Sequence, residues 1–158
     1  MPKIQTNTKT FEDVLDAVKN KGLKVTAPNK GDSFEIGKAK CEVMTDSILN
    51  KDNLNLSSIV IRLEFENNSF LFMGDAETAN EKTRTWMKTD VLKVGHHGSN
   101  TSSSEDFLKQ INPTYAVIMA GKNNSYGLPK QKILDRLAKI GAKVYRTDEE
   151  GTIMMISN

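Results

Sequence analysis

Short apolar runs separated by turn-forming residues constrain the fold of this 158-residue chain. Runs of this length that are rich in Val, Ile and Phe are typical of strands. They lie at 58–65, 69–73, 91–94, 115–119 and 143–146. Segments with helical periodicity come between several of them, at 78–88, 105–111 and 129–140. Strands that alternate with helices predict a layered α/β fold in which helices flank mixed sheets.

The first third of the chain predicts a helix followed by a hairpin. Thr10 and Asp13 suggest a capped helix start, and Gly22 predicts the end of that helix. The remaining expected elements are a strand at 23–26, a hairpin at 33–36 and 39–44, and a last strand at 152–156. No linker or internal repeat divides the sequence, so we expect one domain over residues 1–158.

Composition sets few limits on what this chain binds. Hydrophobic residues make up 37% and charged residues 27%, as in a globular domain, and the net charge of +2 neither requires nor excludes a polyanion. Cys41 is the only cysteine, which excludes an intrachain disulfide and a cysteine-based zinc site. The basic residues near the C-terminus are interpreted mainly as a solvated helix face: Lys130, Lys132, Arg136, Lys139, Lys143 and Arg146.

No stretch approaches the roughly 20 apolar residues that span a bilayer, and the N-terminus lacks the apolar region of a signal peptide. As written, the chain is therefore expected to be soluble and cytoplasmic, without membrane contact. A longer parent protein could be extracytoplasmic.

Asp75 is the first candidate for chemistry. It follows the apolar run at 69–73 and the turn residue Gly74. A carboxylate held at a strand end is a common metal ligand. The alternative is that Asp75 caps the helix that follows it.

His96 and His97 are the only histidines of the chain, and they lie together between Gly95 and Gly98 after the run at 91–94. Neutral imidazole is a zinc ligand and a general acid or base near neutral pH. We expect one ring to serve a site and the other to pack or orient; the alternative is a histidine pair in a surface loop. The hydroxyl-rich segment at 99–104 lacks a nucleophile elbow, and 121–127 lacks phosphate-loop spacing.

Several motifs in order resemble one family, the metallo-β-lactamase-fold domain of DNA-uptake competence proteins. They are FLFMGD at 70–75, VLKVGHHGS at 91–99, NSYG at 124–127 before Pro129, and VYRTD at 144–148 before Gly151. The resemblance implies a four-layer αββα sandwich of two related halves, of which this chain would be the C-terminal portion and so an incomplete domain.

The resemblance also implies site residues and a cofactor. Asp75 matches a metal-bridging aspartate, and His96 and His97 match a catalytic histidine pair, with His97 taken as a ligand beside Asp75. The implied cofactor is one or two zinc or manganese ions. The implied chemistry is attack of metal-activated water on a phosphodiester, with nucleic acid as a possible substrate.

Two departures from the family pattern shape the functional prediction. The chain has no His-x-His-x-Asp-His cluster, and Leu128 stands where the last metal histidine would fall. Asp75 and one histidine fall short of the roughly three protein ligands of a catalytic zinc site. We therefore expect metal binding to be weak or absent and the chain alone to be inactive. An uncovered sheet face would also favour self-association, as a dimer.

Three functional hypotheses remain open from the sequence. The first is a non-catalytic or catalytically incomplete relative of the family. The second is an active metal-dependent phosphodiesterase or nuclease whose remaining ligands come from a partner chain or an upstream segment. The third is a doubly wound domain that binds a small ligand at its strand ends.

Overall fold

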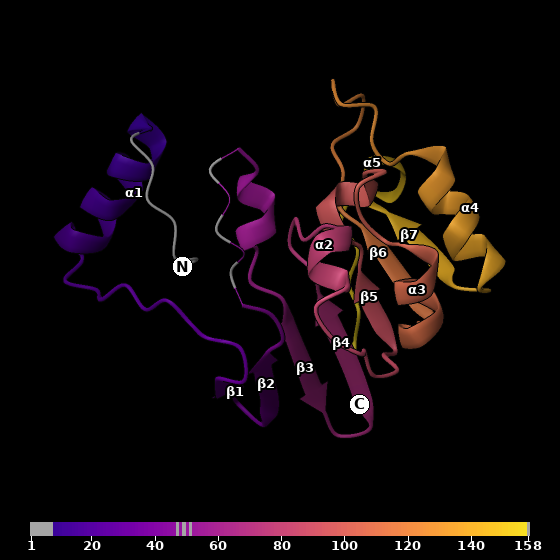
Figure 1. Cartoon of the computed structure of the whole chain (residues 1–158), viewed down its shortest axis with the longest axis horizontal. Coiled ribbons are helices and arrows are strands. Elements are labelled where there is room, and N and C mark those ends of the chain that lie inside the picture. The colour runs from indigo at the N-terminus through magenta and orange to yellow at the C-terminus, as the bar shows by residue number, and fades with distance from the viewer. Residues whose placement is uncertain (1–7, 47, 49, 51, 158) are drawn as a thin grey trace.

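The computed structural model describes residues 8–46, 48, 50 and 52–157. In this part of the chain seven strands form one sheet, in the order β1-β2-β3-β4-β5-β6-β7 (Figure 1). The strands are β1 (Ser33–Ile36), β2 (Ala39–Val43), β3 (Ile61–Phe65), β4 (Asn68–Phe72), β5 (Val91–Lys93), β6 (Tyr115–Ile118) and β7 (Lys143–Arg146). Strands β1 to β4 pair antiparallel and β4 to β7 pair parallel, so the sheet is mixed.

The helices predicted over 105–111 and 129–140 are present and cover one face of this sheet (Figure 1). The described helices are α1 (Lys9–Asn20), α2 (Thr78–Glu81), α3 (Glu105–Ile111), α4 (Gln131–Lys139) and α5 (Thr147–Glu150), with 3-10 turns η1 (Leu54–Ser57) and η2 (Gly95–Gly98). Among the described helices, none has both the length and the apolar character needed to cross a membrane. The predicted layered α/β fold is confirmed.

The core lies on one face of the sheet, under α3 and α4. Leu71, Leu92 and Ala116 are aligned across β4, β5 and β6 and are buried. The helices contribute fully or almost fully buried side chains to the same cluster: Phe107, Leu108, Ile111, Ile133 and Leu137. Because alternate residues of a strand point to opposite faces, these three aligned side chains define the face that the helices cover.

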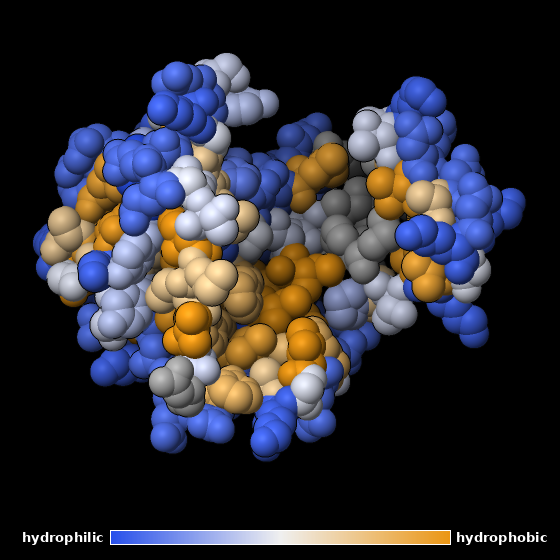
Figure 2. All heavy atoms as spheres, turned by 180° about the vertical axis from the view of Figure 1, so that it is seen from behind, coloured by the Kyte–Doolittle hydropathy of each residue, from blue (hydrophilic) through white to orange (hydrophobic). Residues whose placement is uncertain are grey.

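The opposite face of the sheet is partly uncovered. Phe34, Ile36, Phe72 and Tyr115 lie on this face by strand register, and 36% to 61% of their surface is exposed. The view from behind shows apolar side chains gathered there (Figure 2). The described residues thus supply one β layer and one α layer, which is half of the four-layer arrangement that the resemblance implies.

The structure corrects several predicted elements. The helix expected over 78–88 ends at Glu81, because the buried Trp86 packs edge-on against Phe107 and donates its indole N–H to the Glu81 carbonyl. The segments 23–26 and 152–156 take no place in the sheet. An extended segment without a hydrogen-bonded neighbour is not a strand.

The start of α1 also differs from the prediction. Thr8, rather than Thr10, caps the helix, and its hydroxyl accepts the backbone N–H of Phe11. Gly22 follows the helix at φ +62°, as predicted for a helix end. Helix α1 stands apart from the sheet and has no buried residue (Figure 1).

Candidate metal and histidine site

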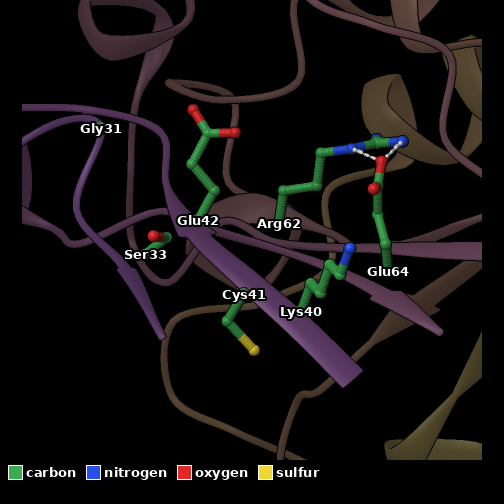
Figure 3. Close-up of a pocket in the computed structure, with 7 residues that line it drawn as sticks. All are labelled: Gly31, Ser33, Lys40, Cys41, Glu42, Arg62 and Glu64. Atoms are coloured by element: carbon green, nitrogen blue, oxygen red, sulfur yellow. Dashed lines mark hydrogen bonds and ion pairs between the residues drawn. The ribbon is translucent and has the colours of Figure 1, made fainter. Parts of the chain in front are cut away.

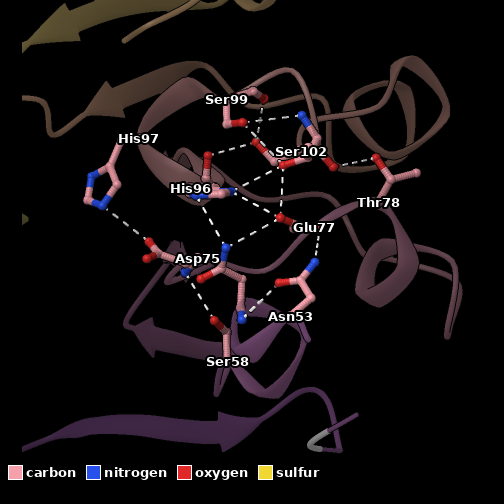
Figure 4. Close-up of polar contacts among 12 residues, drawn as sticks. Asn53, Ser58, Asp75, Glu77, Thr78, His96, His97, Ser99 and Ser102 are labelled. Atoms are coloured by element: carbon pink, nitrogen blue, oxygen red, sulfur yellow. Dashed lines mark hydrogen bonds and ion pairs between the residues drawn. The ribbon is translucent and has the colours of Figure 1, made fainter. Parts of the chain in front are cut away.

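The candidate residues come together at the carboxyl ends of β4, β5 and β6. Asp75 follows β4, the histidine pair lies in η2 after β5, and Met119 follows β6. Because these three strands run parallel, their ends meet at one edge of the sheet. Asp75 and His97, distant in sequence, are 3.2 Å apart at this edge (Figure 4).

An unusual backbone conformation turns the two imidazoles apart. His96 and His97 both have positive φ, at 46° and 53°, a region that few residues other than glycine adopt. The backbone N–H of His96 donates to the Gly74 carbonyl at 3.0 Å and so joins the two loops. Gly95 permits this approach, because a Cβ there would lie 2.9 Å from the Ala76 carbonyl oxygen. The rings end 6.4 Å apart, with 65° between their planes.

His97 faces Asp75. Its Nδ1 lies 2.6 Å from the Met119 carbonyl oxygen, which can only accept, so Nδ1 carries a proton. Its Nε2 points at Oδ1 of Asp75 at 3.2 Å. This separation suits an ion pair, and it is close to the roughly 3.3 Å between two donors on one tetrahedral zinc ion. The side chains of both residues are more than 40% exposed.

His96 belongs to a second, more enclosed set of contacts. Its Nδ1 lies 3.2 Å from Oε1 of Glu77 and 3.1 Å from Oγ1 of Thr101. Its Nε2 lies 3.4 Å from the side-chain amide nitrogen of Asn55. With Nδ1 as the donor, Nε2 accepts the Asn55 amide, so the ring is held at both nitrogens.

Glu77 organises these contacts, although sequence reasoning did not single it out. Its carboxylate accepts the hydroxyl of Thr101 at 3.0 Å and the side-chain amides of Asn53 and Asn55 at 2.9 and 3.4 Å. Its side chain is only 13% exposed. The one available signal was its position two residues after Asp75, in the same turn (Figure 4).

The hydroxyl-rich segment at 99–104 supports the site rather than supplying a nucleophile. The buried Ser102 donates its hydroxyl to the Gly95 carbonyl at 2.8 Å. The buried carboxylate of Glu81 accepts the backbone N–H groups of Ser103 and Ser104. These bonds fix the loop between η2 and α3.

Lys93 is a partly desolvated cation close to this edge. Burial lowers the pKa of Lys93, and the negative charge of Asp75 partly opposes that effect. Its Nζ donates to the Val94 carbonyl at 2.7 Å. Asp75 therefore stabilises the charged form of Lys93 against the effect of burial.

The donor set of the described residues does not fit a complete catalytic zinc site. Within them, no group of three or more His, Cys, Asp or Glu residues could hold a metal ion. The backbone N–H of Lys130 donates to the Gly98 carbonyl, which places the Leu128–Pro129 segment beside the histidine loop. The position at which the resemblance implies a histidine thus lies near the site but carries an apolar side chain. Weak metal binding stays a prediction.

A separate hollow of about 280 Å³ lies on β2 and β3 (Figure 3), and neither histidine is among the residues that line it. Its charged groups are partly satisfied, since Arg62 pairs with Glu64 at 3.0 Å and donates to the Thr89 hydroxyl. Burial raises the pKa of the neighbouring Cys41, which favours the unreactive thiol. This hollow does not gather a catalytic set of side chains.

Comparison with known proteins defines the class. Residues 12–122 match the metallo-beta-lactamase superfamily, and the chain belongs to it. Its relatives include competence proteins. It is 36% identical over 157 residues to ComE operon protein 3 of Bacillus subtilis, covering 97% of this chain and 20% of that protein. It is 42% identical over 101 residues to Recombination protein 2 of Haemophilus influenzae, covering 63% of this chain and 13% of that protein.

Two further matches agree with this class. Competence protein ComA of Neisseria gonorrhoeae is 36% identical over 104 residues, covering 63% of this chain and 15% of that protein. The chain thus spans about a fifth or less of these relatives. A solved mutant of CmlA beta-hydroxylase shares the fold, with a TM-score of 0.57 and 13% identity over 83% of this chain and 34% of that one. The predicted family and its relation to competence proteins are confirmed, and zinc is the metal that the superfamily generally binds.

Proposed function

We propose that this chain contributes the Asp75–His97 side of a metal-dependent phosphodiesterase site and that, by itself, it is catalytically incomplete. The observation that carries the proposal is the 3.2 Å approach of Asp75 Oδ1 to His97 Nε2, with no third metal-binding side chain joining them among the described residues. A catalytic zinc ion needs about three protein ligands to be held and to activate water. Two donors bind such an ion weakly, and a single carboxylate binds Mg²⁺ more weakly still.

The related competence and recombination proteins suggest nucleic acid as the substrate class. Lys93, whose charged form Asp75 stabilises, supports an anionic substrate at this edge. The phosphodiester backbone is the anionic group common to DNA and RNA.

A second candidate is an active phosphodiesterase whose other ligands come from another segment or a partner chain. The exposure of Asp75 and His97, at 41% and 44% of their side chains, supports it, because donors from elsewhere can reach both. In that case zinc or manganese would bind between the two polypeptide surfaces.

The experiment combines metal titration with hydrolysis of bis-p-nitrophenyl phosphate under Zn²⁺ or Mn²⁺. The wild type is compared with Asp75→Ala and His97→Ala, and Asp135→Asn, an exposed carboxylate on α4, is the control. We expect no stoichiometric metal and no turnover that depends on Asp75. One bound ion per chain, with turnover that Asp75→Ala abolishes and Asp135→Asn retains, would overturn the proposal.

A further inference from the structure

The peptide group between Met119 and Ala120 is held at both ends by side chains. Its carbonyl oxygen, that of Met119, accepts Nδ1–H of His97 at 2.6 Å. Its N–H, that of Ala120, donates to Oγ1 of Thr147 at 2.9 Å. Because a peptide group is planar and rigid, fixing the N–H also fixes the direction of the carbonyl. Thr147 is therefore linked to His97 through the rigid peptide group between Met119 and Ala120.

The hydroxyl of Thr147 is fully engaged at this place. Besides accepting the N–H of Ala120, it donates to the Ala120 carbonyl at 2.8 Å. Thr147 begins α5, directly after the pairing of Arg146 with Ile118 across β7 and β6. The parallel pairing of these strands sets the hydroxyl beside the end of β6, where the chain turns toward the site.

The two side chains next to this peptide group differ in their packing, since Ala120 packs against the core and Met119 does not. The side chain of Met119 is 52% exposed, so it is not anchored in the core. Residues 121–127, which follow, are mostly exposed turns. The hydrogen bonds with Thr147 therefore add a directional polar restraint to the apolar packing of Ala120.

We propose that Thr147 is a positioning residue for His97. It aims the Met119 carbonyl at Nδ1, which selects the neutral tautomer protonated at Nδ1 and leaves the lone pair of Nε2 directed at Asp75. The inference rests on the proposed function in one respect, that His97 is the imidazole of the site. The carboxylate of Asp75 favours the opposite tautomer, with the proton on Nε2. The ratio of the two tautomers therefore depends on how well the Met119 carbonyl is placed to accept the proton of Nδ1.

The test is the tautomer of His97, measured by long-range ¹H–¹⁵N NMR on metal-free protein at a pH at which both rings are neutral. Thr147→Val removes the hydroxyl at nearly constant shape, and Thr147→Ser keeps it. We expect the wild type and Thr147→Ser to be protonated at Nδ1, and Thr147→Val to raise the Nε2-protonated fraction about fivefold, the effect of one lost hydrogen bond. The tautomer of His96, which Glu77 holds, is the internal reference and should not change.

An unchanged His97 tautomer in a folded Thr147→Val protein would overturn the inference. A wild type protonated mainly at Nε2 would overturn it as well, and this measurement needs no variant. Neither result depends on bound metal or turnover. A failed inference would therefore leave the proposed function standing, and the metal and hydrolysis experiments can fail without changing the tautomer result.

Discussion

Oε1 of Glu77 lies 3.2 Å from Nδ1 of His96, so an acidic side chain fixes the histidine that does not face Asp75. The two adjacent histidines therefore have separate supports. A carboxylate holds His96 and a backbone carbonyl holds His97. Outer contacts of this kind fix the orientation and the tautomer of an imidazole.

Replacing Glu77 should weaken both the fold and the orientation of His96. Glu77→Ala leaves the half-buried amides of Asn53 and Asn55 and the exposed hydroxyl of Thr101 without their acceptor, which should cost about 1 kcal/mol of the free energy of unfolding. Glu77→Gln keeps one acceptor oxygen and should cost less. Denaturant unfolding measures both, and Glu35→Ala, an exposed residue on β1, is the control. Equal stability of Glu77→Ala and the control would contradict the role given to Glu77.

The contact between Gly98 and Pro129 should be intolerant of a side chain. A Cβ on Gly98 would lie 2.7 Å from Cβ of Pro129, and φ there is +80°. Gly141 is a matched control, with φ +74° and no atom within 4 Å of the added Cβ. Gly141→Ala should cost about 1–2 kcal/mol from backbone strain alone, and Gly98→Ala about 1–3 kcal/mol more from overpacking. Chemical denaturation of the two variants measures the difference, and similar losses in both would argue against the close packing.

Leu128→His should strengthen metal binding. The Leu128–Pro129 segment lies beside the histidine loop, and a third imidazole would bring the donor set to the number that a catalytic zinc site requires. We expect zinc affinity to rise by at least the 10- to 100-fold that an outer-shell contact typically contributes. Isothermal titration calorimetry measures this, with Tyr126→His as a control, because Tyr126 is 78% exposed two positions away. An equal gain in both variants would show that the position itself has no special role.

The ion pair between Arg146 and Asp148 should make the stability of the domain depend on pH. The hydrogen bond from the Arg146 guanidinium lowers the pKa of Asp148 in the folded state. A carboxyl whose pKa is lowered by folding stabilises the fold above its unfolded value and loses that contribution as the pH falls through the folded value. Asp148→Asn should therefore cost about 1 kcal/mol at neutral pH and little in strong acid. Unfolding curves at both pH values measure this, and ¹³C NMR titration of Asp148 checks the direction of its shift.

Self-association through the uncovered sheet face stays a prediction. Ile36 and Phe72 expose 61% and 43% of their surface on this face, and exposed apolar surface favours pairing with another copy. Light scattering over a concentration series should show a dimer that Ile36→Glu or Phe72→Glu weakens about tenfold or more. Val25→Glu alters an exposed apolar residue outside the sheet and is the control. A monomer at all concentrations would contradict the prediction.

The sheet was largely predictable, because its strands carry their own signals. Short apolar runs located β3 and β4, and the predicted hairpin at 33–36 and 39–44 located β1 and β2. Helix α2 was predicted too long, since its end depends on Trp86 and Phe107, which meet only in the folded state. Local propensity does not contain such contacts.

Asp75 and His97 could be found from the sequence because each follows an apolar run and a glycine-containing turn. Their partners could not be found in that way. Glu77 lies in a polar turn without periodicity, and the Met119 contact is made by a backbone oxygen that every residue possesses. The role of Thr147 depends on the pairing of β6 with β7, which is a property of the assembled sheet.

The order of strands in the sheet is the order of strands in the chain. Each strand can therefore pair with the edge strand that precedes it in the chain. No strand has to insert later between two strands that are already paired. An assembly that follows the chain would bring the ends of β4, β5 and β6 together in that sequence, and Thr147 could bond the peptide group beside His97 only after β7 has paired with β6.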